Sequence, residues 1–287
     1  MPLHRLRLAA LICQQFALGH NSNLVKTRRA ARDQRRRQRH AAARLAQRND
    51  ALAAKLRQQG YLRLNPGYSA ELIAALKEGA AFADQPGASV AMGGRIKESV
   101  RYIVDPLGKV AALRELLTPE LAATVRAWFG SEFRIDSVRM WRIAHVPPEE
   151  QNRYHYGNLW HVDGHPLDTL KLFVQISDDA AATGSAFRLL SRTDTRRAFR
   201  GGYLDPHHVL GAARRLVNEN AVFFDGPPGE VMFVDTDVCL HRAGIPAPGQ
   251  QRAMVQLIFK PADEAPAAGD YFANVPLDPN VYEGAIA

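Results

Sequence analysis

The sequence contains only two cysteines, Cys13 and Cys239, among its 287 residues. Two cysteines cannot build a disulfide framework, and the chain has neither a CxxC pair nor a zinc-finger spacing of Cys and His. Long apolar runs are lacking too. Polar residues interrupt the one candidate targeting stretch, residues 6–18, and no run approaches the roughly 18 apolar residues that a membrane span needs. We therefore expect a cytoplasmic protein in a reducing compartment.

Excess positive charge is absent from most of the chain. The 37 basic and 29 acidic residues give a net charge of +8, but residues 1–60 hold 14 basic and only 2 acidic residues. The rest of the chain therefore carries a net charge of −4. A body of that charge has no broad basic surface for a polyanion, so nucleic acid is not an expected partner of the whole chain.

Residues 26–59 are rich in Ala, Arg, Gln and Leu and contain no Pro or Gly, which predicts one long helix. Leu45, Leu52 and Leu56 give it a thin apolar stripe, and four arginines between residues 35 and 39 make one end strongly basic. Two interpretations stay open. The helix is either a solvated arm or oligomer contact, or a segment that docks on an anionic membrane surface or another polyanion.

Capping residues then mark two helices. Ser69 precedes a helix predicted over residues 70–82, and Thr118 precedes a helix that begins with Pro119 and ends at Gly130. The first half of the chain is thus predicted to be mainly helical.

From residue 133 onward the apolar period changes from 3.6 to 2, as expected for strands. The clearest strands are residues 169–177, 231–234 and 253–259. Short strands separated by Gly/Pro turns indicate an antiparallel sandwich or jelly roll. We expect a mainly β fold with flanking helices.

The stretch NLWHVDGHP, residues 158–166, carries the most informative motif. In an extended chain His161 and Asp163 point to the same side, so an imidazole and a carboxylate can face one ligand. The second half of the motif is GEVMFVDTDVCLHRAG, residues 229–244, which supplies His241 and is followed by Arg252 at the head of an apolar strand. Two His and one carboxylate on one face of a metal leave the opposite positions open, as in non-haem Fe(II) oxygenases. Arg252 offers a planar fork for a buried carboxylate.

With these motifs, residues 56–262 resemble the Fe(II)/2-oxoglutarate-dependent dioxygenases, and most closely their phytanoyl-CoA dioxygenase-like branch. The segments that carry the resemblance are GYLRL, WHVDGHP, LKLFVQISD, TGS at 183–185, GEVMFVDTDVCLHRAG and QRAMVQLIFKP. The resemblance implies a double-stranded β-helix (jelly roll, cupin-like) with flanking helices and, in this chain, a basic helical N-terminal extension over residues 1–59. The oxygenase domain would then span residues 60–287, with a helical part over 60–130, a barrel over about 131–262 and a C-terminal tail.

The resemblance also implies the roles of the motif residues. His161, Asp163 and His241 would hold Fe(II), and Arg252 would bind the distal carboxylate of the cosubstrate 2-oxoglutarate, with O2 as the second cosubstrate. Arg142 is the next candidate for the carboxylate clamp. Because the halogenating members of the family lack the carboxylate, Asp163 favours hydroxylation over halogenation, while desaturation and ring formation stay open.

One departure from the family pattern concerns the substrate region. Where the family commonly shows Gly-Ser-His, this chain reads Leu190-Ser191-Arg192. The following residues 191–220 are too long for a simple connection, and we expect a substrate-covering lid with a Gly201-Gly202 hinge or a solvated loop. On the lid interpretation, Arg197 and Arg200 bind an acidic substrate.

Several other residues compete for roles near the motif. His165 could contact substrate, hydrogen-bond a ligand or lie on the surface, and His207 and His208 are expected to be solvated. Cys239 could complete a zinc set with His161 and His241, although a buried structural thiol is the commoner case. Asp235 and Asp237 could compete as metal ligands, although stabilising a turn before His241 is the commoner role. Trp160 is expected to pack in the core rather than to stack on substrate.

The expected function is hydroxylation of an unactivated C–H bond in a small-molecule metabolite, with release of succinate and CO2. Two alternatives come from other classes: a cupin-like binding protein without turnover, and an adaptor whose basic segment, residues 26–59, binds membrane or nucleic acid. The sequence is also compatible with an oligomer. The residues do not identify the substrate.

Overall fold

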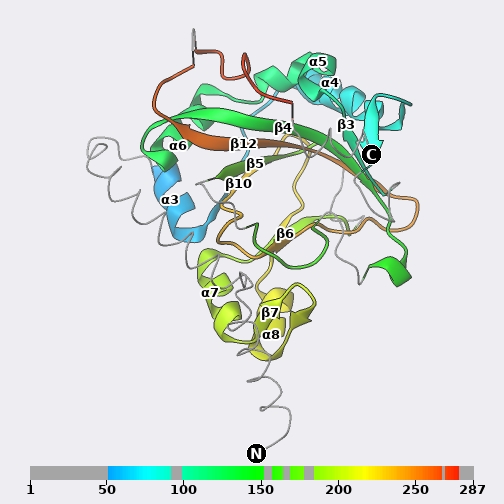
Figure 1. Cartoon of the computed structure of the whole chain (residues 1–287), viewed down its shortest axis with the longest axis vertical. Helices are drawn as coiled ribbons and strands as arrows, with labels where there is room; N and C mark the ends of the chain where they lie inside the picture. The colour runs from blue at the N-terminus through cyan, green and yellow to red at the C-terminus, as the bar shows by residue number, and fades with distance from the viewer. Residues whose placement is uncertain are drawn as a thin grey trace, which may run out of the picture.

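A computed structural model describes residues 51–91, 99–151, 157–163, 169–177, 184–266 and 269–277. These residues form a large antiparallel sheet with helices on its outer face and a smaller antiparallel sheet on its inner face (Figure 1). Two facing antiparallel sheets with helices outside make a jelly roll, which confirms the predicted fold class.

The large sheet has seven strands, and every neighbouring pair in it is antiparallel. Its spatial order is β1 (Tyr61–Leu64), β10 (Val231–Val234), β5 (Leu170–Gln175), β12 (Gln251–Ala262), β4 (Glu132–Ala144), β3 (Val100–Ile103) and β2 (Ser89–Ala91).

The smaller sheet contains three strands in the order β11 (His241–Arg242), β6 (Phe187–Leu189) and β9 (Val222–Phe224). A separate hairpin joins β7 (Tyr203–Asp205) to β8 (His208–Val209). Strands β11 and β5 belong to different sheets. Since the two sheets face each other, residues on the inner faces of these strands meet in the space between the sheets.

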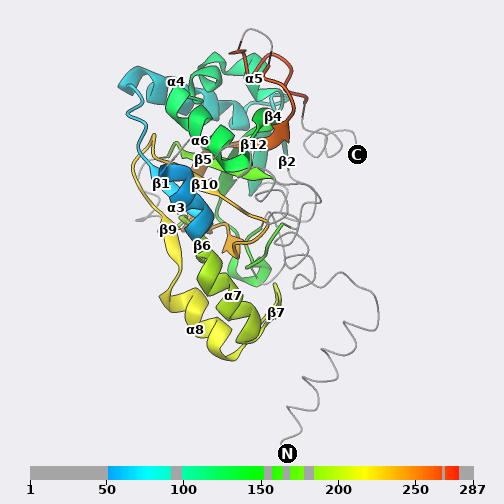
Figure 2. The ribbon, with the colours of Figure 1, turned by 90° about the vertical axis from the view of Figure 1, so that its left-hand side faces the viewer.

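Helices cover the outer face of the large sheet (Figure 2). They are α4 (Ala70–Ala80), η1 (Ala81–Asp84), α5 (Pro106–Lys109), η2 (Ala111–Glu115) and α6 (Pro119–Phe129), and a further short turn, η3 (Pro148–Glu150), follows β4. The strand period explains which side chains they cover. In β5, Leu172 and Val174 pack in the cluster under the helices, whereas Phe173 packs in a second cluster between the sheets.

The predicted capping residues are present. The Ser69 hydroxyl accepts from the Leu72 amide at 3.1 Å, and α4 runs to Ala80 before η1 continues the chain, so the helix ends two residues earlier than predicted. Thr118 caps α6, and Gly130 ends it in a left-handed conformation. The first half also contains β1, β2 and β3, so it is less helical than its pattern indicates.

Residues 191–220 correct one expectation, because they fold into a helical pair rather than a long loop. This pair consists of α7 (Arg192–Arg200) and α8 (Gly211–Glu219), with the β7–β8 hairpin between them. The Ser191 hydroxyl accepts from the Asp194 amide at 3.1 Å and caps α7. Ala198 of α7 and Ala213 of α8 are fully buried in one apolar cluster, and this packing accounts for the helices.

The predicted helix over residues 26–59 falls mostly outside the described residues. Its last part is α3 (Ala51–Gln59), which ends at Gly60 as expected. Leu56 of the apolar stripe is fully buried, and the Arg57 guanidinium donates to the Ala127 carbonyl of α6. This end of the predicted arm therefore packs against the sheet domain. No helix among the described residues has the length and apolar character of a membrane span.

Candidate metal centre

Backbone pairing brings the two halves of the motif together between the sheets. The His161 amide donates to the His241 carbonyl at 3.0 Å, and the His241 amide donates to the His161 carbonyl at 2.9 Å. Two residues further on, the Asp163 amide donates to the Thr236 carbonyl at 3.1 Å. These bonds fix segments that are about 80 residues apart in the chain side by side.

The side chains of these three residues then converge. Their ligand atoms all lie within 4.8 Å of one another. Oδ1 of Asp163 is 3.5 Å from Nε2 of His161 and 3.7 Å from Nε2 of His241. Ligand bonds of about 2.1 Å place neighbouring donor atoms roughly 3 to 3.5 Å apart, so only a small contraction is needed around a divalent ion.

Both imidazoles direct Nε2 toward the Asp163 carboxylate, where a metal would be bound. Nδ1 of His161 lies 2.8 Å from the Leu159 carbonyl oxygen, and Nδ1 of His241 lies 2.9 Å from the Cys239 carbonyl oxygen. A carbonyl can only accept, so each Nδ1 carries the proton and each Nε2 keeps its lone pair. Such hydrogen bonds from the distal ring nitrogen orient histidine ligands in metal sites.

The surroundings keep His241 and Asp163 in the protonation states that a metal requires. Burial, followed by the neighbouring His161 ring, lowers the pKa of His241 to about 3. Burial by itself would raise the pKa of Asp163, but the positive charge of Lys171 and the two imidazoles outweigh it and hold that pKa well below its ordinary value. The site therefore holds a neutral His241 imidazole and an ionised Asp163 carboxylate in advance of any metal.

Lys171 was not among the candidate residues, yet it completes this site. Its Nζ lies 2.7 Å from Oδ2 of Asp163, on the oxygen that does not face the imidazoles, and its side chain is only 7 % exposed. The sequence signal was a single cation within the apolar strand residues 169–177. The alternation of β5 places Lys171 and Phe173 on the inner face, away from the helices.

Gly157 is a second residue that sequence reasoning missed. It has a φ of +77°, and a Cβ at this position would lie 2.8 Å from Cε1 of His161. Its carbonyl accepts from the Ala243 amide at 2.8 Å. A side chain here would therefore push the His161 ring out of place while straining the backbone.

Arg252 lies in the same space between the sheets. It is 1 % exposed, and its guanidinium donates to the carbonyl of Ser185. Arg142, the next candidate for the clamp, forms an ion pair with Asp84 and does not line the cavity around the triad. Arg252, and not Arg142, therefore lines the same cavity as His161, Asp163 and His241.

A cavity of about 220 Å3 connects these groups. The triad, Lys171 and Arg252 line it together with polar, aromatic and apolar side chains from β3, β4, β5, β6 and β12: Tyr102, Arg139, Trp141, Phe173, Phe187, Met254 and Gln256. A cavity lined by both charged and aromatic groups suits a small polar molecule.

The remaining candidates lie elsewhere. His165 is outside the described residues. Arg197 and Arg200 are on α7 and do not line this cavity; Arg197 is 64 % exposed and pairs with Asp194 at 3.1 Å. Exposed His208 pairs with Asp205 in the β7–β8 hairpin.

The competing metal ligands do not join the triad among the described residues. The Cys239 thiol lies 3.9 Å from the Gln59 carbonyl oxygen, and burial raises its pKa, so it stays protonated. Asp235 accepts from Arg192 at 2.7 Å, and its carbonyl accepts from the amides of Val238 and Cys239, which is the expected role in the turn. Trp160 is buried in the cluster with α7 and α8, as expected.

The chemistry of the donor set fits a divalent transition metal. Two neutral imidazoles and one carboxylate on one side of a point are the ligand set of metal sites that keep positions open for other ligands. The pairing of Asp163 with Lys171 and of each Nδ1 with a carbonyl supplies the supporting contacts that such sites need.

No protein-family model matches the sequence, and a comparison with curated proteins finds no match. Solved structures do match in shape. They include the non-heme α-ketoglutarate-dependent epimerase SnoN from nogalamycin biosynthesis, in complex with Fe3+, α-ketoglutarate and nogalamycin RO (TM-score 0.54, 17 % identity, 80 % of this chain and 95 % of that chain). The α-ketoglutarate-dependent carbocyclase SnoK from the same biosynthesis also matches (TM-score 0.53, 16 % identity, 76 % and 85 %).

A third match is EctD from S. alaskensis in its apo form (TM-score 0.54, 16 % identity, 80 % of this chain and 82 % of that chain). At these identities the likeness establishes the fold. It is the jelly roll that non-haem iron enzymes dependent on 2-oxoglutarate use.

Proposed function

We propose that this chain is a non-haem Fe(II)- and 2-oxoglutarate-dependent oxygenase that hydroxylates an unactivated C–H bond of a small molecule. The observation that carries the proposal is the convergence of His161, Asp163 and His241 in one cavity with buried Arg252. The resemblance of the sequence motifs points further to the phytanoyl-CoA dioxygenase-like branch, which is a finer part of the same proposal.

The shape matches support the cofactor assignment. SnoN was solved with Fe3+ and α-ketoglutarate, and EctD was also solved with 2-oxoglutarate and 5-hydroxyectoine. In this chain His161, Asp163 and His241 would hold Fe(II). Bound iron supplies the activation of O2 that an organic side chain cannot provide.

Arg252 would bind and orient 2-oxoglutarate. Its guanidinium is a permanent cation with a planar fork that matches a carboxylate, and its burial strengthens such a pair. The overall reaction balances as substrate plus 2-oxoglutarate plus O2 giving hydroxylated substrate, succinate and CO2. The aromatic walls of the cavity would exclude water and hold the substrate carbon near the metal.

Hydroxylation is the preferred outcome because, by the family resemblance, Asp163 would occupy the ligand position that halogenating members of that family leave to halide. Epimerase and carbocyclase activities are printed for SnoN and SnoK, so the same fold supports other outcomes. For this chain, substrate placement relative to the metal would decide among them.

The test is release of succinate from 2-oxoglutarate by the Fe(II)-loaded full chain in the presence of O2. Replacing His161, Asp163 or His241 singly by Ala should abolish this release and weaken Fe(II) binding in calorimetry, because each removes one of three ligands. The exposed His208→Ala variant is the matched control and should keep both properties. Metal binding without succinate release would favour the cupin-like binding protein instead. Full activity in two of the three triad variants would overturn the assignment.

Three further residues belong to the proposal. His165, Arg197 and Arg200 would bind the primary substrate, with α7 acting as part of its cover. For the basic segment, residues 26–59, contact with an anionic membrane surface stays a proposal, tested by sedimentation with phosphatidylserine vesicles of the full chain and of a variant lacking residues 1–50.

A further inference from the structure

The residues beside the histidine ligands pack behind the cavity and not in it. Trp160 and Val162 stand on either side of His161, and both are buried. Leu240, also buried, directly precedes His241. Because side chains alternate along an extended chain, these three neighbours point away from the ligands. They pack in one apolar cluster with side chains of α7 and α8, and none of them is among the described residues that line the cavity. Figure 1 and Figure 2 show α7, α8 and β7 as one group, away from α4 and α5. The α7–α8 pair therefore backs the segments that carry the ligands.

Two buried hydroxyls of this pair and its hairpin bind the backbone beside the ligands. The Tyr203 hydroxyl donates to the Trp160 carbonyl at 2.7 Å, and the Leu240 amide donates to the Thr195 hydroxyl at 3.0 Å. Each of these backbone groups belongs to the residue that directly precedes a histidine ligand. Thr195 is 1 % exposed and Tyr203 is 3 % exposed. Because a buried backbone group needs a hydrogen-bond partner, loss of either hydroxyl would leave one unsatisfied next to a ligand.

A third contact from α7 reaches Asp163 through the turn before β11. Arg192, the first residue of α7, donates to Oδ2 of Asp235 at 2.7 Å, and Asp235 is buried. The next residue is Thr236, whose carbonyl accepts from the Asp163 amide at 3.1 Å. The α7–α8 pair and its hairpin thus make one polar contact near each of the three ligands.

The pairing between the two histidines needs such support. It consists of the two reciprocal backbone bonds of an isolated bridge, and β11, which begins at His241, is only two residues long. Pairing of so few residues is marginal without further packing. The ring centroids of His161 and His241 are 4.2 Å apart, so a small shift of either backbone moves one Nε2 relative to the other. Contacts to the neighbouring residues therefore control the separation of two ligand atoms.

We infer that Thr195 and Tyr203 are positioning residues, whose hydroxyls hold the backbone beside the two histidine ligands at the separation that the metal needs. The inference rests on the proposed function, because it concerns the same metal centre. It assigns this role to the buried face of α7 and to the hairpin that follows. The exposed arginines of α7, Arg197 and Arg200, take no part in it, so their contact with substrate is a separate proposal.

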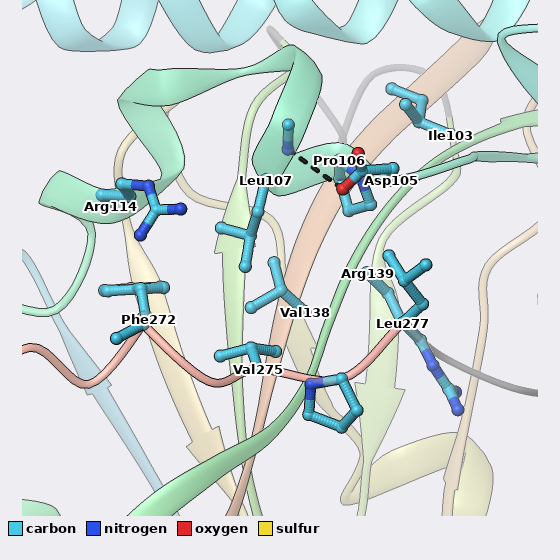
Figure 3. Close-up of a pocket in the computed structure, with 13 residues that line it drawn as sticks. Ile103, Asp105, Pro106, Leu107, Arg114, Val138, Arg139, Phe272, Val275 and Leu277 are labelled. Atoms are coloured by element: carbon cyan, nitrogen blue, oxygen red, sulfur yellow. Dashed lines mark hydrogen bonds between the residues drawn. The ribbon is translucent and has the colours of Figure 1, made fainter. Parts of the chain in front are cut away.

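A second cavity, elsewhere in the molecule, offers a control for a general loss of stability. It has a volume of about 210 Å3 and lies between β4, α5 and the segment that follows β12 (Figure 3). Phe272 borders it and is buried in the cluster under the helices. The described residues that line it include none of the triad and none of the α7–α8 pair. Phe272→Leu should therefore lower stability through lost apolar contacts and leave the contacts beside the ligands intact.

The experiment titrates the metal-free full chain with Co(II), following heat by calorimetry and ligand geometry by the visible absorption bands of the bound ion. Thr195→Val and Tyr203→Phe each remove a hydroxyl with little change in volume. Each should lower Co(II) affinity about tenfold, as loss of supporting contacts does in metal sites, and should alter the Co(II) bands. Thr195→Ser keeps the hydroxyl and should restore most of the affinity and the wild-type bands. If Thr195→Val does not fold, Tyr203→Phe decides the question by itself.

Two matched controls remove the same groups elsewhere. Thr124→Val removes a buried hydroxyl of α6 that donates to the Glu120 carbonyl at 3.1 Å, and Tyr68→Phe removes one that donates to the Leu116 carbonyl. Both variants, like Phe272→Leu, should keep the wild-type Co(II) affinity and bands, whatever their change in urea unfolding.

The outcomes separate the inference from the proposal on which it rests. A wild-type protein that does not bind Co(II) would contradict the proposed function. Wild-type affinity in both Thr195→Val and Tyr203→Phe would overturn the present inference alone, and so would equal losses in the matched controls. A Thr195→Ser variant as weak as Thr195→Val would overturn the role of the hydroxyl at that position.

Discussion

The ammonium group of Lys171 lies 2.7 Å from Oδ2 of Asp163, and Oδ1 of the same carboxylate faces the two imidazoles. The two oxygens of one side chain thus have separate tasks. Lys171 holds one oxygen, which fixes the rotation of the carboxylate and leaves the other free to ligate a metal. It also keeps Asp163 ionised in a buried position.

Lys171→Met should therefore make metal binding more sensitive to acid. Without the ammonium group the pKa of Asp163 rises, so protons compete with the metal as the pH falls. We expect Co(II) affinity to fall about tenfold relative to wild type at pH 6, and by less at pH 8, where the carboxylate is ionised in both proteins. Calorimetric titration at the two pH values measures this difference.

The control for that experiment is Lys260→Met, because Lys260 pairs with Asp136 on the same sheet away from the triad. It should leave Co(II) affinity unchanged at both pH values. If Lys171→Met alters affinity by the same factor at pH 6 and pH 8, Lys171 does not act through the ionisation of Asp163.

Arg252→Lys should weaken the binding of 2-oxoglutarate. The substitution keeps the charge but loses the two-pronged hydrogen bond, so apparent affinity should fall at least tenfold, about 1.4 kcal/mol, with a smaller effect on the primary substrate. Titration of the Fe(II)-loaded protein with 2-oxoglutarate gives the value. An unchanged titration curve would show that another group binds the distal carboxylate.

The site could be predicted from the sequence to the extent that its chemistry is local. An extended chain is enough to place the side chains of His161 and Asp163 on the same side. Arg252 stands at the head of an apolar strand, where a buried arginine requires a charged partner. Lys171 was not predicted because strand alternation alone does not say whether the second face meets solvent or a cavity. Only the packing of the smaller sheet over β5 makes that face an interior one.

The fold class followed from the period-2 strands, but the α7–α8 pair did not. Its turn residues, Gly201 and Gly202, resemble those of a loop. The short helices are stabilised by burial of Ala198 and Ala213 against a distant part of the chain that includes Leu240, and no local pattern reveals that contact.

Arg197→Ala and Arg200→Ala test the cover that α7 would provide. If these side chains contact an acidic substrate, both variants should bind the primary substrate more weakly, while 2-oxoglutarate decarboxylation without substrate stays unchanged because that reaction needs only the metal and Arg252. Substrate-binding and succinate assays separate the two effects. Normal substrate binding in both variants, or a parallel loss of both reactions, would assign these arginines to the surface or to the fold.

The metal-free protein should lose stability between pH 6.5 and pH 4 because of His241. Its pKa is about 3 when folded and 6.5 when unfolded, so in this range the unfolded chain binds a proton that the folded chain does not. Stability must then fall as the pH falls, by on the order of 3 kcal/mol at pH 4 from this group. Asp163 acts in the same direction, but only below its unfolded pKa of 3.8.

His241→Asn should make the pH dependence of urea unfolding shallower by about that amount, whereas exposed His208→Asn should not. Equal slopes for wild type and His241→Asn would mean that the His241 imidazole is already protonated in the folded protein.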